Sequence, residues 1–233
     1  MTIDVPYILT NSITMVNVFF IFLLCFRIYT KTKGASLAYK KWATATFLFF
    51  AASSLYVTFG LLFGCNESSS RDINEMHKIM GFTLNALGFF FLPLGMIYLE
   101  KDLSIGNVTE NVIKKIQIFF FTIIFSIFGI MMILIPFFTI IRVAGIIYNA
   151  LFAVILMFAV YHYNTIYGYL KPINVCWTII YVGLLAAFIV EVLNLFYYAF
   201  LPSLYPIMLA LRLLMAVSFM TGFYKLGRMV GAI

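Results

Sequence analysis

Seven long apolar runs, separated by short polar stretches, make up most of the sequence. A helix that crosses a bilayer needs about 20 mostly apolar residues, because it rises about 1.5 Å per residue through a hydrocarbon core about 30 Å thick. The predicted spanning helices are residues 8–29, 42–63, 78–99, 113–136, 138–162, 172–200 and 204–224. This pattern predicts an all-α bundle of seven transmembrane helices that forms a single domain over residues 1–233.

The fourth and fifth spans lie in one apolar stretch, which continues without a polar break through Ile135, Pro136 and Phe137. The stretch has about 50 residues, which is about twice the length that a bilayer accommodates. Proline interrupts a helix because it lacks the backbone N–H and its ring clashes with the preceding turn. We therefore predict two helices with a tight turn at Pro136.

The composition fits a membrane protein and excludes a soluble one. Of the 233 residues, 64% are hydrophobic and 10% are charged, whereas soluble domains are about half apolar and about a quarter charged. With 27 Phe, 15 Tyr and 2 Trp, a globule of this size could not bury its apolar surface, so the excess must face lipid. The polar stretches are too short to form a separate catalytic domain. We expect a multi-pass integral protein of the cell membrane, in contact with the lipid bilayer.

The basic residues predict the orientation of the bundle. The end of the first span and the stretch that follows it contain no acidic residue and five basic ones: Arg27, Lys31, Lys33, Lys40 and Lys41. Such clusters face the cytoplasm. Alternation then places eleven of the fifteen basic residues inside and three outside, which predicts an outer N-terminus and a cytoplasmic C-terminus. The same rule accounts for the net charge of +7, so no nucleic-acid partner is expected.

Ionisable residues inside a bilayer are costly, so those within the spans are candidates for function. Glu191 lies eleven residues before Pro202, in the expected outer turn, and Arg212 lies ten residues after it. In an antiparallel helix pair both side chains would lie about 15 Å from the turn, close to the midplane. We predict an ion pair between them. Such a pair fits a ligand or substrate site, and it also fits a structural role that fixes the register of two helices.

Four asparagines are expected at a nearby depth: Asn17, Asn85, Asn149 and Asn194. With Glu191 and Arg212 they form a predicted polar cluster in the outer half of the bundle. The cluster either lines a ligand cavity or supplies hydrogen bonds between helices, each worth about 1 kcal/mol or less in a membrane. The sequence leaves both alternatives open.

Five glycines are expected to serve helix packing: Gly60, Gly64, Gly81, Gly88 and Gly95. The first two have the GxxxG spacing of close helix contacts. The last three recur every seven residues, so they lie on one face of the span 78–99 and allow a neighbouring helix to approach closely. We therefore expect this span to be central in the bundle.

The residues that several cofactors and metals require are missing. Retinal attachment needs a lysine at mid-membrane in the last span, and that zone contains Arg212 instead. A haem with two histidine ligands is excluded because His77 and His162 are expected at opposite sides of the membrane. The sequence contains no zinc motif and no nucleophile elbow. We predict no cofactor, no metal and no catalytic residue, although an unusual intramembrane enzyme stays open.

Pro93 is expected to bend the span 78–99. The segment 93–101, Pro-Leu-Gly-Met-Ile-Tyr-Leu-Glu-Lys, resembles a run in the prokaryotic seven-helix sensor regions that precede histidine kinase domains. The resemblance covers this helix end and the overall topology. It implies a membrane sensing module. Because these 233 residues include no kinase domain, a signal is expected to pass to a separate cytoplasmic or membrane partner protein.

Three functions are compatible with the sequence. The first is a sensor or receptor-like module that binds a small or lipidic ligand and passes a helix shift to a partner. The second is a small permease with a polar site at the midplane, and the third is a structural or assembly subunit of a membrane complex. A tight ion pair between Glu191 and Arg212 would favour the third, and a roomy chamber around them would favour the first or second.

Overall fold

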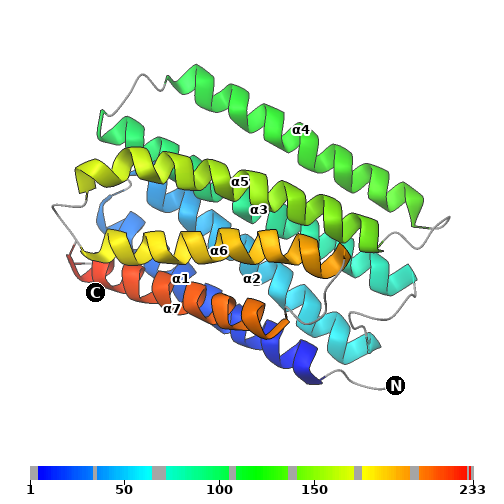
Figure 1. The fold of residues 1–233 in the computed structure, drawn as a ribbon. Helices are drawn as coiled ribbons and strands as arrows, with labels where there is room; N and C mark the ends of the chain where they lie inside the picture. The colour runs from blue at the N-terminus through cyan, green and yellow to red at the C-terminus, as the bar shows by residue number, and fades with distance from the viewer. Residues whose placement is uncertain are drawn as a thin grey trace.

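A computed structural model describes residues 5–33, 36–64, 72–104, 109–135, 141–170, 175–199, 205–229 and 231. The described residues form seven helices and no strand: α1 (Val5–Lys31), α2 (Leu37–Phe63), α3 (Asp72–Asp102), α4 (Glu110–Leu134), α5 (Ile141–Leu170), α6 (Val175–Ala199) and α7 (Tyr205–Met229). Each helix is long and apolar enough to cross a membrane (Figure 1). This confirms the predicted all-α, seven-helix architecture of a multi-pass membrane protein. The orientation of the termini stays a prediction from the basic residues.

Several helices extend beyond the predicted spans. α2 begins at Leu37 rather than at residue 42, and α3 runs from Asp72 to Asp102 rather than over 78–99. The extra turns are expected physically, since the headgroup regions add about 10–15 Å to the hydrocarbon core. α4 ends at Leu134 and α5 begins at Ile141, so the long apolar stretch does form two helices. The turn assigned to Pro136 lies outside the described residues.

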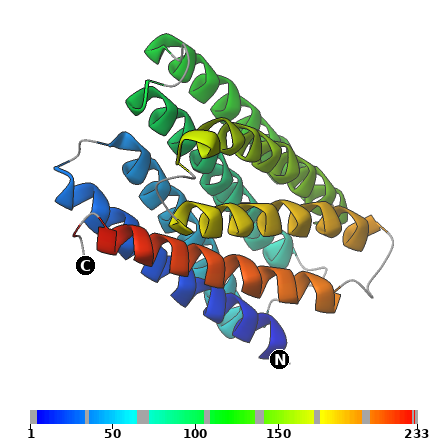
Figure 2. The ribbon, with the colours of Figure 1, turned by 60° about the vertical axis from the view of Figure 1, so that its left-hand side comes forward.

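Six of the described helices form a closed ring, in which α1 packs on α2, α2 on α3, α3 on α5, α5 on α6, α6 on α7 and α7 on α1. α4 lies outside this ring and packs on α3 (Figure 1). Figure 2 shows α1 and α7 next to each other, at the edge of the bundle opposite α4. α3 contacts α2, α4 and α5, so it has the central place that its glycines predict.

The outward faces of the helices are apolar. On α4, Ile118 and Ile133 expose 67% and 68% of their surface. On α1, the exposed residues Leu9, Ile13 and Val16 follow the three- to four-residue spacing of one helix face. Lipid tails are as apolar as these side chains, so their exposure carries no hydrophobic cost. These exposed apolar side chains form the surface that contacts the bilayer.

Aromatic side chains of α2 lie on the glycines of α3. The three pairs are Trp42 with Gly95, Phe49 with Gly88 and Tyr56 with Gly81. Both sets recur every seven residues, so the pairs stack in one register along the two antiparallel helices. A Cβ atom at any of these glycines would lie closer than 3.0 Å to the facing ring. The close approach predicted for the three glycines is therefore made by aromatic rings.

Gly64 is not on the helical packing face that its GxxxG spacing predicts. It caps the C-terminus of α2 with φ 62° and ψ 27°, and its backbone N–H donates to the carbonyl of Phe59. This left-handed conformation favours glycine because it has no Cβ atom. Gly60 lies within α2 and is buried. The predicted pair thus consists of one buried helix residue and one helix cap.

Candidate functional site

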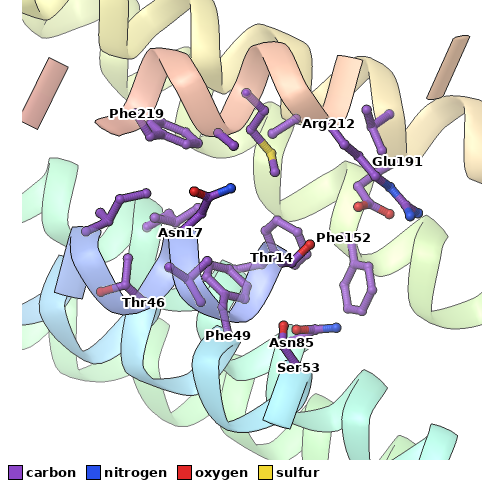
Figure 3. A pocket seen from close by; sticks show the side chains of 18 of the residues that line it. Thr14, Asn17, Thr46, Phe49, Ser53, Asn85, Phe152, Glu191, Arg212 and Phe219 are labelled. Carbon is purple, nitrogen blue, oxygen red and sulfur yellow. The ribbon is translucent and has the colours of Figure 1, made fainter. Parts of the chain in front are cut away.

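The helix ring encloses an elongated cavity of about 310 Å³. Its described lining comes from α1, α2, α3, α5, α6 and α7 and not from α4. Figure 3 shows this lining from close by. Along α3 the lining extends from Lys78 to Met96, which is about 27 Å at 1.5 Å per residue. The cavity is therefore nearly as long as a hydrocarbon core is thick.

All six residues of the predicted polar cluster line this cavity: Asn17 from α1, Asn85 from α3, Asn149 from α5, Glu191 and Asn194 from α6, and Arg212 from α7. We call the end of the bundle at which α1 begins the outer end, following the predicted orientation. At 1.5 Å per residue, the six lie about 8–20 Å from the outer ends of their helices. The structure thus brings the whole predicted cluster together in the outer part of one cavity.

Glu191 and Arg212 are joined through Asn194 and not by the predicted direct ion pair. Asn194 Nδ2 donates to Glu191 Oε2 at 3.0 Å, and Arg212 Nη2 donates to Asn194 Oδ1 at 3.5 Å. Within the described part of the chain, no carboxylate oxygen lies within 4.0 Å of the Arg212 guanidinium. Figure 3 shows Glu191 and Arg212 close to each other at the cavity. The amide of Asn194 bridges the two charged groups.

The depths of the three residues explain this bridge. Counted from the outer helix ends, Glu191 lies about 12 Å deep, Asn194 about 8 Å and Arg212 about 10 Å. Arg212 therefore lies at a depth between those of Glu191 and Asn194. These depths also place the group between the outer end and the middle of α6 and α7, which have 25 residues each.

Two of the asparagines offer unused amides to the cavity. The side chains of Asn17 and Asn85 are half-buried, and neither forms a hydrogen bond with another described residue. Figure 3 shows both among the lining residues. Asn149 differs, because its Nδ2 donates to the carbonyl of Gly145 at 2.6 Å. Polar groups removed from bulk water normally have a hydrogen-bond partner, so the two unused amides indicate positions for ligand or water atoms.

The inner part of the cavity is apolar and aromatic. Its lining includes Trp42, Leu92, Met96, Ile180, Leu184, Phe219 and Phe223. The ring of Trp42 packs at 6.1 Å from that of Trp177 and at 5.7 Å from that of Phe223, and its Nε1 donates to the carbonyl of Leu92 at 3.2 Å. All three rings are buried. This aromatic cluster lies at the inner end of the cavity, which is therefore polar at one end and apolar at the other.

The cavity reaches the lipid-facing surface between α1 and α7. Ile13 and Leu213 line it, yet they expose 45% and 49% of their surface. Both belong to outward rows of their helices, Ile13 with Leu9 and Leu213 with Val217. Every other described lining residue is buried or half-buried. Ile13 and Leu213 thus mark a mouth that opens sideways into the bilayer.

The sequence interpretation missed two features of the bundle. Lys78, one of the three basic residues that alternation assigns to the outer side, is only 6% exposed and lines the cavity. Toward the inner end, His162 Nδ1 lies 2.9 Å from Glu100 Oε1 and joins α5 to α3. Glu100 is 3% exposed. A signal for this pair does exist in the sequence, since a carboxylate at the end of an apolar run needs a partner and His162 lies at a similar depth.

The described residues include no group of three or more His, Cys, Asp or Glu side chains that could hold a metal ion. Cys25 and Cys176 are buried free thiols. The polar end of the cavity offers hydrogen-bond donors and acceptors instead, and the guanidinium of Arg212 is one of them.

Comparison with known protein families, with curated proteins and with solved structures finds no match to this chain. The function therefore has to be inferred from the cavity itself.

Proposed function

We propose that this multi-pass membrane protein is a receptor-like sensor module that binds a small or lipidic ligand inside its helix ring. The observation that carries this proposal is the convergence of six polar residues from five helices on one cavity of about 310 Å³. A largely apolar pocket of about 300 Å³ or more with a few convergent polar groups is typical of a ligand site.

A purely structural role explains the polar residues less well. Polar groups that only hold helices together would be hydrogen-bonded to one another. Asn17 and Asn85 have no such bond among the described residues, and Arg212 reaches Asn194 only at 3.5 Å. The cluster leaves hydrogen-bonding capacity that a ligand can use.

A permease is the second candidate, and the charged residues inside the ring favour it. Transport also requires a path from the polar cluster to the inner end of the bundle. The contacts of Trp42 with Trp177 and Phe223 lie in that path. A cavity with a side mouth and a filled inner end fits binding better than passage.

A ligand in the cavity has a direct route to the inner end of the bundle. α3 and α5 both contribute to the lining, through Asn85 and Asn149, and further inward they are joined by Glu100 and His162. A ligand that moves α3 against α5 would change this contact. We therefore place the surface for a separate partner protein at the inner ends of these two helices, which agrees with the resemblance of segment 93–101 to sensor regions.

Native mass spectrometry of the protein, purified in mild detergent, tests the proposal. Wild-type protein should retain a bound non-protein mass. Ala216→Phe places a ring in the cavity and should lose this mass. Ala210→Phe adds the same ring to the exposed face of the same helix and should retain it.

Thermal unfolding provides the control for folding. In a Cys65→Ser background, a thiol-reactive dye reports the unfolding of the protein through Cys25 and Cys176, which are buried. All three proteins should unfold cooperatively. Equal bound mass on Ala216→Phe and wild type, or no bound mass on folded wild type, would contradict the proposed function.

A further inference from the structure

We infer that the ligand is a single-chain amphiphile with an anionic carboxylate or phosphate head, and that it reaches the cavity from the bilayer between α1 and α7. This inference rests on the proposed function, because it names the ligand of the same cavity.

The head is assigned by Arg212. A guanidinium carries five N–H donors in a planar fork that matches carboxylate and phosphate oxygens. Within the described residues, Arg212 uses one of these donors, at 3.5 Å to Asn194. The nearby carboxylate of Glu191 is instead held by the amide of Asn194 at 3.0 Å. The cation therefore keeps most of its hydrogen-bonding capacity for an oxygen acid in the cavity.

The remaining polar side chains suit the uncharged oxygens of such a head. Asn17 and Asn85 present amides without a described protein partner, and an amide both donates and accepts. Lys78 adds a second positive charge to the lining, with the buried Glu75 one turn before it on α3. The described lining contains two basic residues and one acidic residue, Glu191, which favours an anion over a cation.

The tail is assigned by the shape of the inner cavity. From the polar cluster the lining continues inward past Phe219 and Leu184 to Trp42 and Met96. A volume of about 310 Å³ spread over a length of about 27 Å leaves room for one extended chain. A two-chain phospholipid needs a much larger volume than this.

The route is assigned by the seam between α1 and α7. Ile13 and Leu213 belong to lipid-facing rows and also line the cavity. Closer to the inner end, the same seam contains a second hollow, lined by Phe20, Leu23, Leu24, Arg27, Met220, Thr221 and Tyr224. Two hollows along one seam indicate that α1 and α7 are not tightly packed against each other. An amphiphile in the bilayer can therefore enter sideways without crossing water.

A competition experiment tests the class of ligand. The protein is placed in phosphatidylcholine nanodiscs and labelled with palmitate that carries a photoreactive diazirine at its chain end. Palmitate and palmitoyl lysophosphatidate should compete for labelling, and their ranking distinguishes the two sources of the anionic head. Hexadecanol and hexadecyltrimethylammonium should be at least tenfold weaker. When competitor concentrations are expressed as the free concentration in water, each added pair of methylenes from octanoate to palmitate should tighten competition about tenfold, since moving each methylene out of water contributes about 0.8 kcal/mol.

Variants of Arg212 and Glu191 test whether the head of the ligand is anionic. Arg212→Gln should weaken palmitate competition at least tenfold, and Arg212→Lys should restore part of it. Glu191→Gln should strengthen the competition, because it removes a negative charge near the head. Equal competition by hexadecanol and palmitate, or loss of binding in Glu191→Gln alone, would overturn the assignment.

The result also separates this inference from the proposed function. If Ala216→Phe removes a bound mass in native mass spectrometry but palmitate does not compete for labelling, the cavity binds another ligand and only the ligand class is wrong. If Ala216→Phe and Ala210→Phe have the same bound mass and the same labelling, both proposals fail.

A cysteine pair tests the route. Ile13→Cys and Leu213→Cys, joined by a bifunctional thiol reagent, should slow the association and dissociation of palmitate at least tenfold with little change in affinity. The uncrosslinked double variant is the matched control. Unchanged rates after crosslinking would place the path elsewhere.

Discussion

Glu100 and His162 are the residues whose contact is easiest to test by single substitutions. The carboxylate is 4% exposed and the imidazole 14%, with 2.9 Å between Oε1 and Nδ1. His162→Ala removes the partner and leaves a buried acceptor unsatisfied, so we expect a loss of about 1–3 kcal/mol in the free energy of unfolding. His162→Gln keeps a donor on a side chain of similar reach, and it should cost less than half as much.

Unfolding by titration with sodium dodecyl sulfate measures both values. Glu100→Gln combined with His162→Ala completes a double-mutant cycle, which isolates the pairwise contribution from the loss of packing. Equal destabilisation by His162→Ala and His162→Gln would show that the imidazole contributes volume rather than a hydrogen bond.

At the scale of helices, the contact between α2 and α3 depends on glycine opposite each aromatic ring. A Cβ atom at Gly88 would lie 2.6 Å from the ring of Phe49. Gly88→Ala should therefore lower the free energy of unfolding by about 1–3 kcal/mol, the usual cost of overpacking. Gly129→Ala on α4, where nothing lies within 4 Å, is the matched control and should be neutral or stabilising.

A second substitution separates steric overlap from loss of glycine itself. Phe49→Ala makes room opposite residue 88, so the cost of Gly88→Ala should shrink in that background. A cost that is unchanged by Phe49→Ala, or equal effects at Gly88 and Gly129, would contradict close packing of the ring on the glycine.

The helices could be predicted from the sequence, and their arrangement in a ring could not. Apolar length alone defines a spanning segment, and the 50 residues from 113 to 162 are about twice as long as one span, which predicts two helices. Which face of a helix is buried is a different question, because lipid and protein interior are equally apolar. Ile118 on α4 is 67% exposed and Ile124 on the same helix is fully buried, yet the residue type is identical. The hydrophobicity of α4 therefore does not predict its position outside the ring.

The polar lining of the cavity could be predicted from the sequence, because polar side chains are costly in lipid. The aromatic lining could not, because aromatic side chains are not. Asn85, Glu191 and Arg212 are costly in lipid, so each is expected to turn inward. The chain has 27 Phe and 15 Tyr, and an aromatic residue is equally stable on either face of a helix, so nothing distinguished Trp42 or Phe219 as lining residues. The bridge by Asn194 was missed because it depends on a depth difference of only a few Å.

At the scale of the whole molecule, the helices that line the cavity are distinct from α4, which lies outside the ring. Six helices enclose the cavity, so any ligand there contacts most of the bundle at once. α4 packs mainly on α3, and it contributes nothing to the described lining. Movement of α3 is thus the change that both the cavity and α4 would register.

The orientation of the bundle decides which leaflet supplies the ligand. Alternation of the predicted spans assigns eleven of the fifteen basic residues to the side of the C-terminus and three to the other side, so we predict that the C-terminus is cytoplasmic. Green fluorescent protein fused after Ile233 should fluoresce, and alkaline phosphatase fused after Gly64 should be active only if that turn lies outside. Active phosphatase after Ile233 would invert the molecule. In the expected orientation Arg212 lies about 10 Å from the outer end of α7, so an anionic amphiphile in the outer leaflet can place its head there without crossing the bilayer.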